Sequence, residues 1–470
     1  MANTLAPKLA LARAVGLLSR LNGGGATSMP GKVLMRLDPG AIAALGSRLR
    51  RGSALVSATN GKTTTTAMAA AVLEHAGVTL VHNQAGANMA GGIATSLLGA
   101  ARAHGQIAGE LGLFEVDELW LAPLAEQLHP RAILLANLFR DQLDRYGELE
   151  TIAESWAHAL RDAGAKLVLN ADDPQIADLG RGRPGVLYFG VQDDSLALAG
   201  MAHAADAKHC SRCGAPYEFA AVYLGHLGHY RCLSCGQARP EPAVTATRVR
   251  LEGVRAARFT LSTPAGEAEV ELQLPGLYNV YNALAAAALA SALEVPLASI
   301  VAGLQTSRAA FGRAETVKLS LSPTSAEPAG GAERELRIML VKNPAGTNEV
   351  LRTLALEPGE HDLLGVLNDK IADGRDVSWI WDADFELLAG RIRRVTCSGT
   401  RASELAVRLK YAGIDPALIS VQPDLALALG ESARDRPDPL APLYALPTYT
   451  AMLSLRELLV ARGEASSAWS

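Results

Sequence analysis

Residues 55–66, which read Leu-Val-Ser-Ala-Thr-Asn-Gly-Lys-Thr-Thr-Thr-Thr, constrain this chain more than any other stretch. The apolar start predicts a buried strand that runs into a tight turn, and residues 67–75 predict a helix after it. Backbone N–H groups in such a turn face an anion, Lys62 neutralises it, and the Thr63 hydroxyl can ligate Mg²⁺. The first glycine of the strict P-loop pattern is absent. We interpret the stretch as a nucleotide site, the alternative being a strand–helix turn that carries Gly-Lys-Thr by chance.

The length and composition are those of a soluble chain of several domains. The 470 residues suffice for two or three domains with buried cores, and the net charge of −4 gives no reason to expect a nucleic-acid partner. Arg13 and Arg20 interrupt the apolar N-terminal run, so we expect no signal peptide. No stretch reaches the roughly 20 apolar residues that span a bilayer, and the alanine-rich residues 283–293 predict a buried helix. We therefore expect a cytoplasmic protein.

Residues 5–22 predict a basic amphipathic helix, because Lys8, Arg13 and Arg20 alternate with apolar positions at helical spacing. Such a helix could rest on an anionic membrane surface at the inner face of the membrane. We favour the alternative that it packs on the first domain.

Carboxylates end a second predicted strand. Residues 113–118 read Leu-Phe-Glu-Val-Asp-Glu, and doubly wound sheets place their ligands at the carboxyl ends of strands. These carboxylates are thus candidates for a ligand site, and a solvated strand end is the alternative.

Four cysteines form the pattern C-x₂-C-x₁₈-C-x₂-C: Cys210, Cys213, Cys232 and Cys235. A glycine follows each pair, which lets a tight turn present two thiolates to one ion. The spacing predicts a tetrahedral zinc ribbon rather than two disulfides, which a reducing compartment disfavours. Beyond Lys208, Arg212 and Arg231, the ribbon has few clustered basic or exposed aromatic residues that could bind nucleic acid, so we expect a structural or partner-docking role. The remaining cysteine, Cys397, is expected to be an inert core thiol.

A composition shift separates the last part of the chain. Residues 320–335 are rich in Ser, Pro, Ala and Gly without apolar periodicity, which is typical of a linker. The α/β pattern that follows contains, in residues 367–386, five Asp and two Trp after an apolar strand. A merely solvated acidic loop does not need two tryptophans, so this cluster indicates a docking or active-site surface.

The stretch Ala-Thr-Asn-Gly-Lys-Thr-Thr resembles the ATP loop of the Mur ligase superfamily, whose members join amines to carboxylates through acyl phosphates. Two further motifs support the resemblance: Leu-Pro-Gly-Leu-Tyr-Asn-Val-Tyr-Asn at residues 274–282 and Gly-Arg at residues 312–313. The resemblance implies that Glu115 and Thr63 hold Mg²⁺. It also implies that ATP is bound by Thr59, Asn60, Gly61, Lys62, Thr63, Thr64, Asn279, Asn282 and Arg313.

At two positions the chain departs from the amino-acid-adding members of this superfamily. Gln142 stands where amino-acid-adding Mur ligases carry a histidine on a second metal, and the helix expected over residues 151–160 lacks the lysine that those enzymes carbamylate. With the Cys₄ ribbon and the Asp/Trp cluster, the chain resembles the MurT family, the ligase-like subunits of lipid II isoglutaminyl synthase. The implied fold is α/β: an N-terminal segment (1–50), a Mur ligase-type P-loop ATPase domain (51–319) with the ribbon inserted at about 205–240, a linker (320–335) and a Rossmann-like C-terminal domain (336–470).

The MurT resemblance implies an ATP-dependent carbon–nitrogen ligase that amidates the α-carboxyl of D-Glu in lipid II, with ATP, Mg²⁺ and Zn²⁺. Lys62 and Glu115 would act in catalysis, and a GatD-like glutaminase partner would supply ammonia. Asp376, with Asp382 as its rival, would complete the catalytic triad of that partner. Two alternatives remain open: a stand-alone amino-acid ligase of the Mur or folate type, and a non-catalytic nucleotide- and zinc-binding scaffold. We expect Lys62→Ala to abolish amidation and to spare folding, because it removes no core volume.

Overall fold

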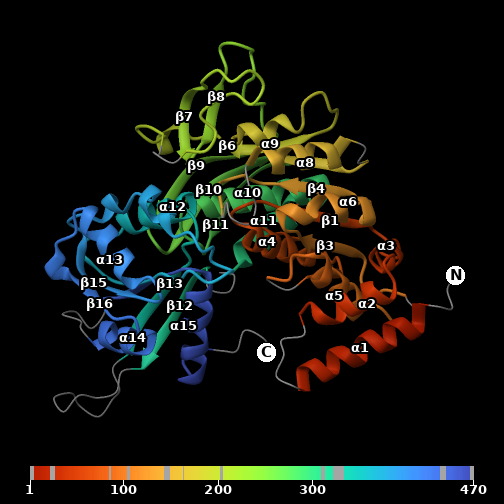
Figure 1. Ribbon diagram of the computed structural model, residues 1–470. Helices are drawn as coiled ribbons and strands as arrows, with labels where there is room; N and C mark the ends of the chain where they lie inside the picture. The colour runs from red at the N-terminus through yellow and green to blue at the C-terminus, as the bar shows by residue number, and fades with distance from the viewer. Residues whose placement is uncertain are drawn as a thin grey trace.

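A computed structural model describes residues 5–21, 27–83, 86–102, 106–141, 149–161, 164–201, 205–308, 313–320, 333–434 and 441–465 (Figure 1). Within these residues the largest element is a nine-stranded sheet. Its strands, in spatial order, are β11 (Gly266–Leu272), β10 (Ala256–Thr263), β9 (Val244–Glu252), β6 (Leu187–Val191), β5 (Lys166–Asn170), β4 (Ala132–Leu135), β1 (Ser53–Ser57), β3 (Leu111–Glu115) and β2 (Leu80–His82). Neighbours from β9 to β2 pair in parallel, whereas β9, β10 and β11 pair antiparallel.

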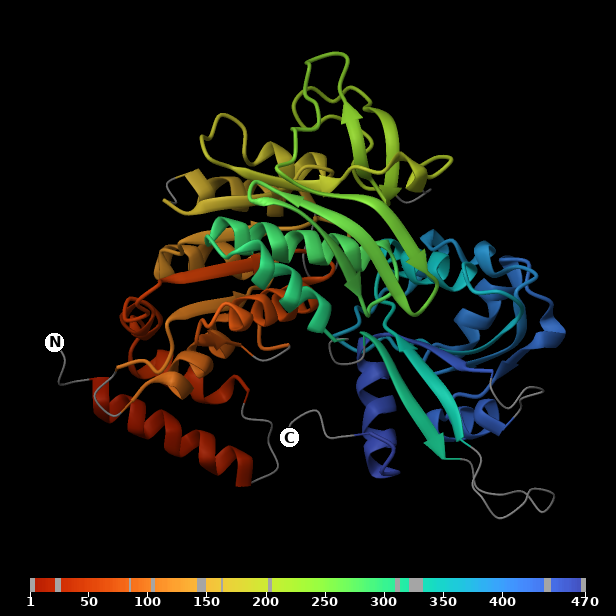
Figure 2. The ribbon, with the colours of Figure 1, turned by 180° about the vertical axis from the view of Figure 1, so that it is seen from behind.

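Helices bury both faces of this sheet. Alternate residues of a strand point to opposite faces, and accordingly Val56 lies in one core while Leu55 lies in the other. The Val56 face is covered by α4 (Lys62–His75), α10 (Leu277–Ala292) and α11 (Leu297–Thr306). In Figure 2, which shows the molecule from behind, α10 and α11 lie in front of the sheet. The other face is covered by α5 (Ala90–Ala100), α6 (Leu121–Leu128) and α8 (Leu149–Arg161), with α9 (Pro174–Asp178) at its edge.

The predicted buried helix at residues 283–293 is the second half of α10. Residues 283–290 are at most 2% exposed. Their alanine side chains are small, so the helix axis can lie close to the sheet and still exclude water.

The N-terminal segment forms three helices: α1 (Leu5–Leu21), α2 (Met29–Leu37) and α3 (Ala41–Gly46). A Cβ on Gly31 of α2 would overlap the carbonyl oxygen of Gly91 in α5, so the two helices cross closely there. Lys8 pairs with Asp38 at 3.0 Å, and Arg13 donates to the carbonyl oxygen of Leu98 at 3.1 Å. The side chain of Arg13 therefore binds the ATPase domain and that of Lys8 binds within the N-terminal segment, while the side chain of Arg20 lies outside the described residues.

A six-stranded sheet forms the C-terminal part of the described chain. Its order is β12 (Arg313–Ser320), β13 (Glu333–Met339), β17 (Leu443–Pro447), β14 (His361–Val366), β15 (Ile392–Ser398) and β16 (Ile419–Val421). All neighbours pair in parallel except β12 with β13. The helices α12 (Pro344–Ala355), α13 (Ala402–Tyr411), α14 (Leu425–Arg434) and α15 (Tyr449–Ala461) pack with it.

The second sheet begins earlier than the composition shift indicates. We expected the central domain to extend to residue 319, but β12 pairs along its length with β13 of the C-terminal sheet. The Ser/Pro/Ala/Gly-rich segment connects the two strands of this hairpin, and its residues 321–332 lie outside the described chain. Composition located the connection, but which sheet takes the strand before it depends on long-range pairing.

The four-cysteine segment is inserted between β6 and β9 of the central sheet, at the top of Figure 1. It contains the antiparallel hairpin β7 (Glu218–Leu224) and β8 (Leu227–Arg231). Its core of Cys210, Tyr217, Tyr230 and Cys232 packs on Ala177 of α9. The described residues include no helix that is both long and apolar enough to cross a membrane.

Candidate nucleotide and metal sites

The predicted phosphate-binding turn follows β1, and α4 begins at Lys62, five residues before the start that the sequence predicts. Gly61 precedes it with φ +84°, and an added Cβ would overlap Oδ1 of Asn282. Glycine is therefore required both by the backbone conformation and by space. The threonine run is helical despite its β-branched side chains because it packs against α10, where the Thr65 hydroxyl donates to Asn282 Oδ1 at 3.2 Å.

Asn137, directly after β4, clamps this turn. The backbone N–H of Asn60 donates to Asn137 Oδ1 at 2.9 Å, and Asn137 Nδ2 donates back to the Asn60 carbonyl oxygen at 3.0 Å. The backbone N–H of Phe139 donates to the Thr59 hydroxyl at 3.0 Å. Sequence reasoning gave Asn137 no role; the available signal was its place at the carboxyl end of an apolar strand.

Lys62 pairs with Glu118, a residue that sequence reasoning also left without a role. Its ammonium lies 2.8 Å from Glu118 Oε2, and the two side chains are 10% and 3% exposed. The ammonium also donates to the carbonyl oxygen of Ala58. Since an ammonium carries three N–H groups, these two contacts leave one for a phosphate oxygen.

The acidic end of the site lies over β3. Glu115 is buried, and its backbone N–H donates to Asn83 Oδ1 at 2.9 Å. Glu115, Asp117 and the half-buried Thr63 line the same cavity. Carboxylate and hydroxyl oxygens are ligands that Mg²⁺ prefers, so the donor set fits this ion.

A cavity of about 730 Å³ extends over the turn and is closed by the C-terminal part of the chain. Lys342 reaches across to Asp141 at 2.6 Å and to the Thr59 carbonyl oxygen at 3.0 Å. The amides of Asn343 and Asn60 exchange hydrogen bonds of 3.0 and 3.2 Å. The volume falls in the range of about 300–1,000 Å³ that small-molecule sites occupy.

The structure places most of the predicted nucleotide-binding residues around this cavity. Thr59 through Thr64, Asn279 and Asn282 all line it. Asn279 donates to the Pro275 carbonyl oxygen at 2.7 Å, and Asn282 Nδ2 donates to Asn279 Oδ1 at 3.1 Å, so these two amides are held in place at the start of α10. The side chain of Arg313 lies outside the described residues, as does Gln142.

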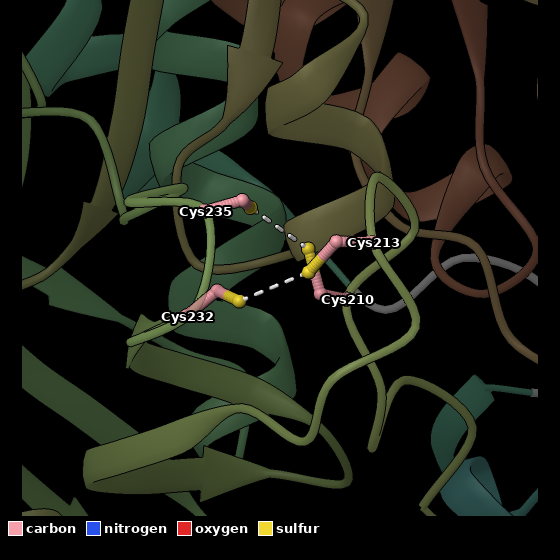
Figure 3. Close-up of side chains that lie close together, drawn as sticks. All are labelled: Cys210, Cys213, Cys232 and Cys235. Carbon is pink, nitrogen blue, oxygen red and sulfur yellow. Dashed lines mark hydrogen bonds between the residues drawn. The ribbon is translucent and has the colours of Figure 1, made fainter.

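The four ribbon cysteines converge (Figure 3), with all four sulfur atoms within 4.8 Å of one another. The Sγ atoms of Cys210 and Cys235, and those of Cys213 and Cys232, lie 3.5 Å apart, and all four thiols are free. Tetrahedral Zn–S bonds put sulfur atoms about 3.8 Å apart, so the geometry fits zinc.

The first ribbon turn also favours a thiolate at Cys210, whereas at Cys235 the backbone N–H of Gln237 lowers the pKa but hydrogen bonds with the other three cysteines raise it to about 12. Burial raises the pKa of Cys210, but backbone N–H groups of Arg212 and Cys213 outweigh it and lower the pKa to about 7. By contrast, burial raises the pKa of Cys397 to about 12, as an inert thiol requires.

Three of the five Asp side chains in the Asp/Trp cluster are engaged within the chain. Asp369 pairs with Arg401 at 2.8 Å, Asp373 accepts from the Thr450 backbone at 2.7 Å, and Asp384 accepts from Asn348 at 2.8 Å.

The other two, Asp376 and Asp382, are the exposed ones. Asp376 accepts from the side chain and the backbone N–H of Ser378, which lower its pKa. Trp381, which directly precedes Asp382, is 52% exposed and stacks with Arg408 at 5.5 Å from the ring centre. The structure thus leaves both candidate carboxylates on the surface and outside the cavity over the P-loop, and Asp382 adjoins an exposed tryptophan in the sequence.

The P-loop sheet, and the second α/β domain that closes over it, define the fold of a Mur ligase. Solved structures share it: MurF from Acinetobacter baumannii (19% identity, 92% of this chain and 80% of that one, TM-score 0.63) and a pseudomurein peptide ligase from Methanothermus fervidus (22% identity, 88% and 79%, TM-score 0.62). The sequence matches the family described as Mur ligase middle domain over residues 56–290 and that described as MurT ligase C-terminal over residues 340–452.

Relatives that match over nearly their full length show to which family of Mur ligases the chain belongs. The chain is 34% identical to the MurT subunit of lipid II isoglutaminyl synthase from Streptococcus pneumoniae, over 95% of this chain and 94% of that one. It is 30% identical to the corresponding subunit from Staphylococcus aureus strain N315, over 96% of each. The chain belongs to the MurT family of Mur ligases, a group of ATP-dependent ligases.

Proposed function

We propose that this chain is the ligase subunit of a lipid II isoglutaminyl synthase, which converts the D-Glu α-carboxyl of the stem peptide to D-isoglutamine. The observation that carries the proposal is the match to MurT subunits over about 95% of the chain, through both domains. The two departures in the sequence, Gln142 and the lysine-free helix α8 (Leu149–Arg161), argue against a stand-alone amino-acid ligase.

The proposed chemistry has two steps. The substrate carboxylate attacks the γ-phosphorus of ATP, ADP leaves, and an acyl phosphate forms. Ammonia then attacks the acyl carbon, inorganic phosphate leaves, and the nitrogen loses a proton to give the amide. Lys62 stabilises charge on the transferred phosphoryl group, using the N–H that its contacts with Glu118 and Ala58 leave for phosphate. Thr63 and Glu115 would hold Mg²⁺, which would supply further charge neutralisation at the phosphates.

The proposal requires a second chain. The sequence shows no evident Cys/His nucleophile motif for glutamine hydrolysis, so a GatD-like glutaminase would supply the ammonia. The exposed pair Asp376 and Asp382 would offer that partner a carboxylate, and we favour Asp376. The complex would work in the cytoplasm, where lipid II presents its stem peptide at the inner face of the membrane.

The test is co-expression with a candidate glutaminase, purification of the complex and assay on lipid II with ATP. We expect ADP and amidated lipid II, with glutamine or free ammonia as nitrogen source. ATP turnover that requires an amino acid instead would support the stand-alone ligase. Absence of ATP turnover with every amine would support the non-catalytic scaffold.

A further inference from the structure

The zinc ribbon reaches the nucleotide cavity through the end of its hairpin that lies away from the cysteines. Leu224 and Leu227, which flank the turn between β7 and β8, line the cavity and are 5% and 1% exposed. Between them, an added Cβ on Gly225 would meet the ring of Phe139 at 2.9 Å, and the His226 ring centre lies 4.7 Å from that of Phe139. The turn is therefore part of the ATPase-domain interior rather than of an external module.

The hairpin turn lies at the apolar end of the cavity. In the sheet order, β3 and β4 flank β1 on opposite sides. The carboxylates Glu115 and Asp117 lie over β3, where they can ligate a metal ion that binds phosphates. On the β4 side follow Asn137 and Phe139, and the neighbouring apolar walls are lined by Leu224, Leu227, Leu274 and Tyr281. A flat, weakly polar group beside amide side chains fits this second end, as is usual for mostly apolar ligand sites.

We propose that Leu224 and Leu227 form the wall against which the nucleobase of ATP packs, which makes the zinc ribbon an element of nucleotide recognition. This inference rests on the proposed function, because it assumes that ATP occupies the cavity. The phosphates bind at the P-loop, and the base extends from there to the ribbon hairpin.

The cysteine end of the ribbon is fixed to residues 172–174 of the ATPase domain, which lead from β5 into α9. The Tyr217 hydroxyl donates to Gln237 Oε1 at 2.9 Å, Cys210 Sγ lies 2.9 Å from the same oxygen, and Gln237 Nε2 donates to the carbonyl oxygen of Pro174 in α9 at 3.5 Å. After the ribbon, Arg239 pairs with Asp172 at 2.6 Å.

Asp172 links the ribbon to the nucleotide helix as well. The hydroxyl of Tyr281 in α10 donates to Asp172 Oδ2 at 2.7 Å, and the backbone N–H of Gly228 in the hairpin donates to the Asp172 carbonyl oxygen at 2.9 Å. One residue thus holds the ribbon exit, the hairpin turn and α10 in fixed positions. The leucines are consequently pre-positioned when the nucleotide arrives, which reduces the ordering cost of binding.

The experiment compares MgATP with magnesium tripolyphosphate, which carries the phosphates without a base, by titration calorimetry on the full chain. Leu227→Ala should weaken MgATP binding about tenfold, equivalent to about 1.4 kcal/mol, and leave tripolyphosphate binding unchanged. Leu227→Met, which keeps an apolar wall, should restore most of the affinity. Leu233→Ala is the matched control, because Leu233 lies in the ribbon between two cysteines and is 64% exposed; it should bind both ligands as the wild type does.

Zinc content and melting temperature of each variant verify that the ribbon remains folded. Unchanged MgATP affinity in Leu227→Ala overturns the inference, and so does an equal loss for both ligands, which would mean general distortion of the P-loop. A wild-type chain that binds neither ligand would instead overturn the proposed function.

Discussion

Replacing Lys62 with methionine separates the stabilising role of this residue from its phosphate contact. From the sequence we expected that loss of Lys62 would spare folding. The structure pairs its ammonium with Glu118 at 2.8 Å, where the carboxylate side chain is only 3% exposed. Methionine retains most of the side-chain volume, so no large cavity term arises. What the substitution removes is the partner of a buried carboxylate.

The expected cost follows from that burial. Removing one partner of a buried ion pair costs about 3–5 kcal/mol, because the remaining charge is left without compensation. Loss of the hydrogen bond to the Ala58 carbonyl oxygen adds about 1 kcal/mol. Glu118→Gln should cost less, about 1–2 kcal/mol, since Lys62 lines the cavity and can be hydrated there. The double variant carries no buried charge and should be more stable than Lys62→Met alone.

The assay is a double-mutant cycle by urea unfolding at constant zinc, with Trp156 as a reporter. Trp156 is fully buried, and its indole N–H donates to the Glu118 carbonyl oxygen at 2.9 Å. The summed single costs should exceed the double cost by about 2 kcal/mol or more. MgATP binding, measured in parallel, should be lost in both variants that lack Lys62 and retained in Glu118→Gln.

Two results would refute this reasoning. If Lys62→Met unfolds at the same urea concentration as the wild type, the ion pair does not contribute to stability. If the double variant is as unstable as the two single costs together, the two side chains do not interact. Only the first result would restore the original expectation that loss of Lys62 spares folding.

Three further predictions concern the ribbon and the partner surface. The purified chain should contain one Zn²⁺ bound by the four-cysteine cluster; metal-free protein with these thiols in disulfides would contradict the assignment. Asp376→Asn should keep ATP binding and complex formation but lose glutamine-dependent amidation, and free ammonia should restore product. Asp382→Asn is the matched control. Normal glutamine hydrolysis by the complex that carries Asp376→Asn would refute our choice of Asp376 as the triad carboxylate. Burial lowers the pKa of His226, but Asp173 at 3.3 Å outweighs it and raises the pKa above its usual value. The stabilisation from the His226–Asp173 pair should therefore be complete below about pH 6.5 and decline as the pH rises through the raised pKa of His226. The measurement is the difference in melting temperature between the wild type and His226→Gln as a function of pH. A difference that does not change with pH would exclude this ion pair as the source of the stabilisation.

The sequence alone was enough for features that are local in the chain. The phosphate-binding turn and the Cys₄ ribbon depend on residues a few positions apart, and such spacings fix the relative placement of backbone N–H groups or thiolates within one turn. The strand, turn and helix around Lys62 and the buried alanine-rich helix α10 follow from the same kind of local information. The early start of α4 does not, because packing against α10 overrides the weak helix propensity of its threonines.

Only the tertiary structure decided contacts between segments distant in the chain. The pairing of Lys62 with Glu118 and the clamp of Asn137 on the P-loop depend on β3 and β4 being the neighbours of β1. The assignment of β12 to the C-terminal sheet and the insertion of Leu227 into the nucleotide cavity likewise depend on which surfaces meet. Strand order and domain closure are set by the summed burial of many side chains, and no short motif encodes that sum.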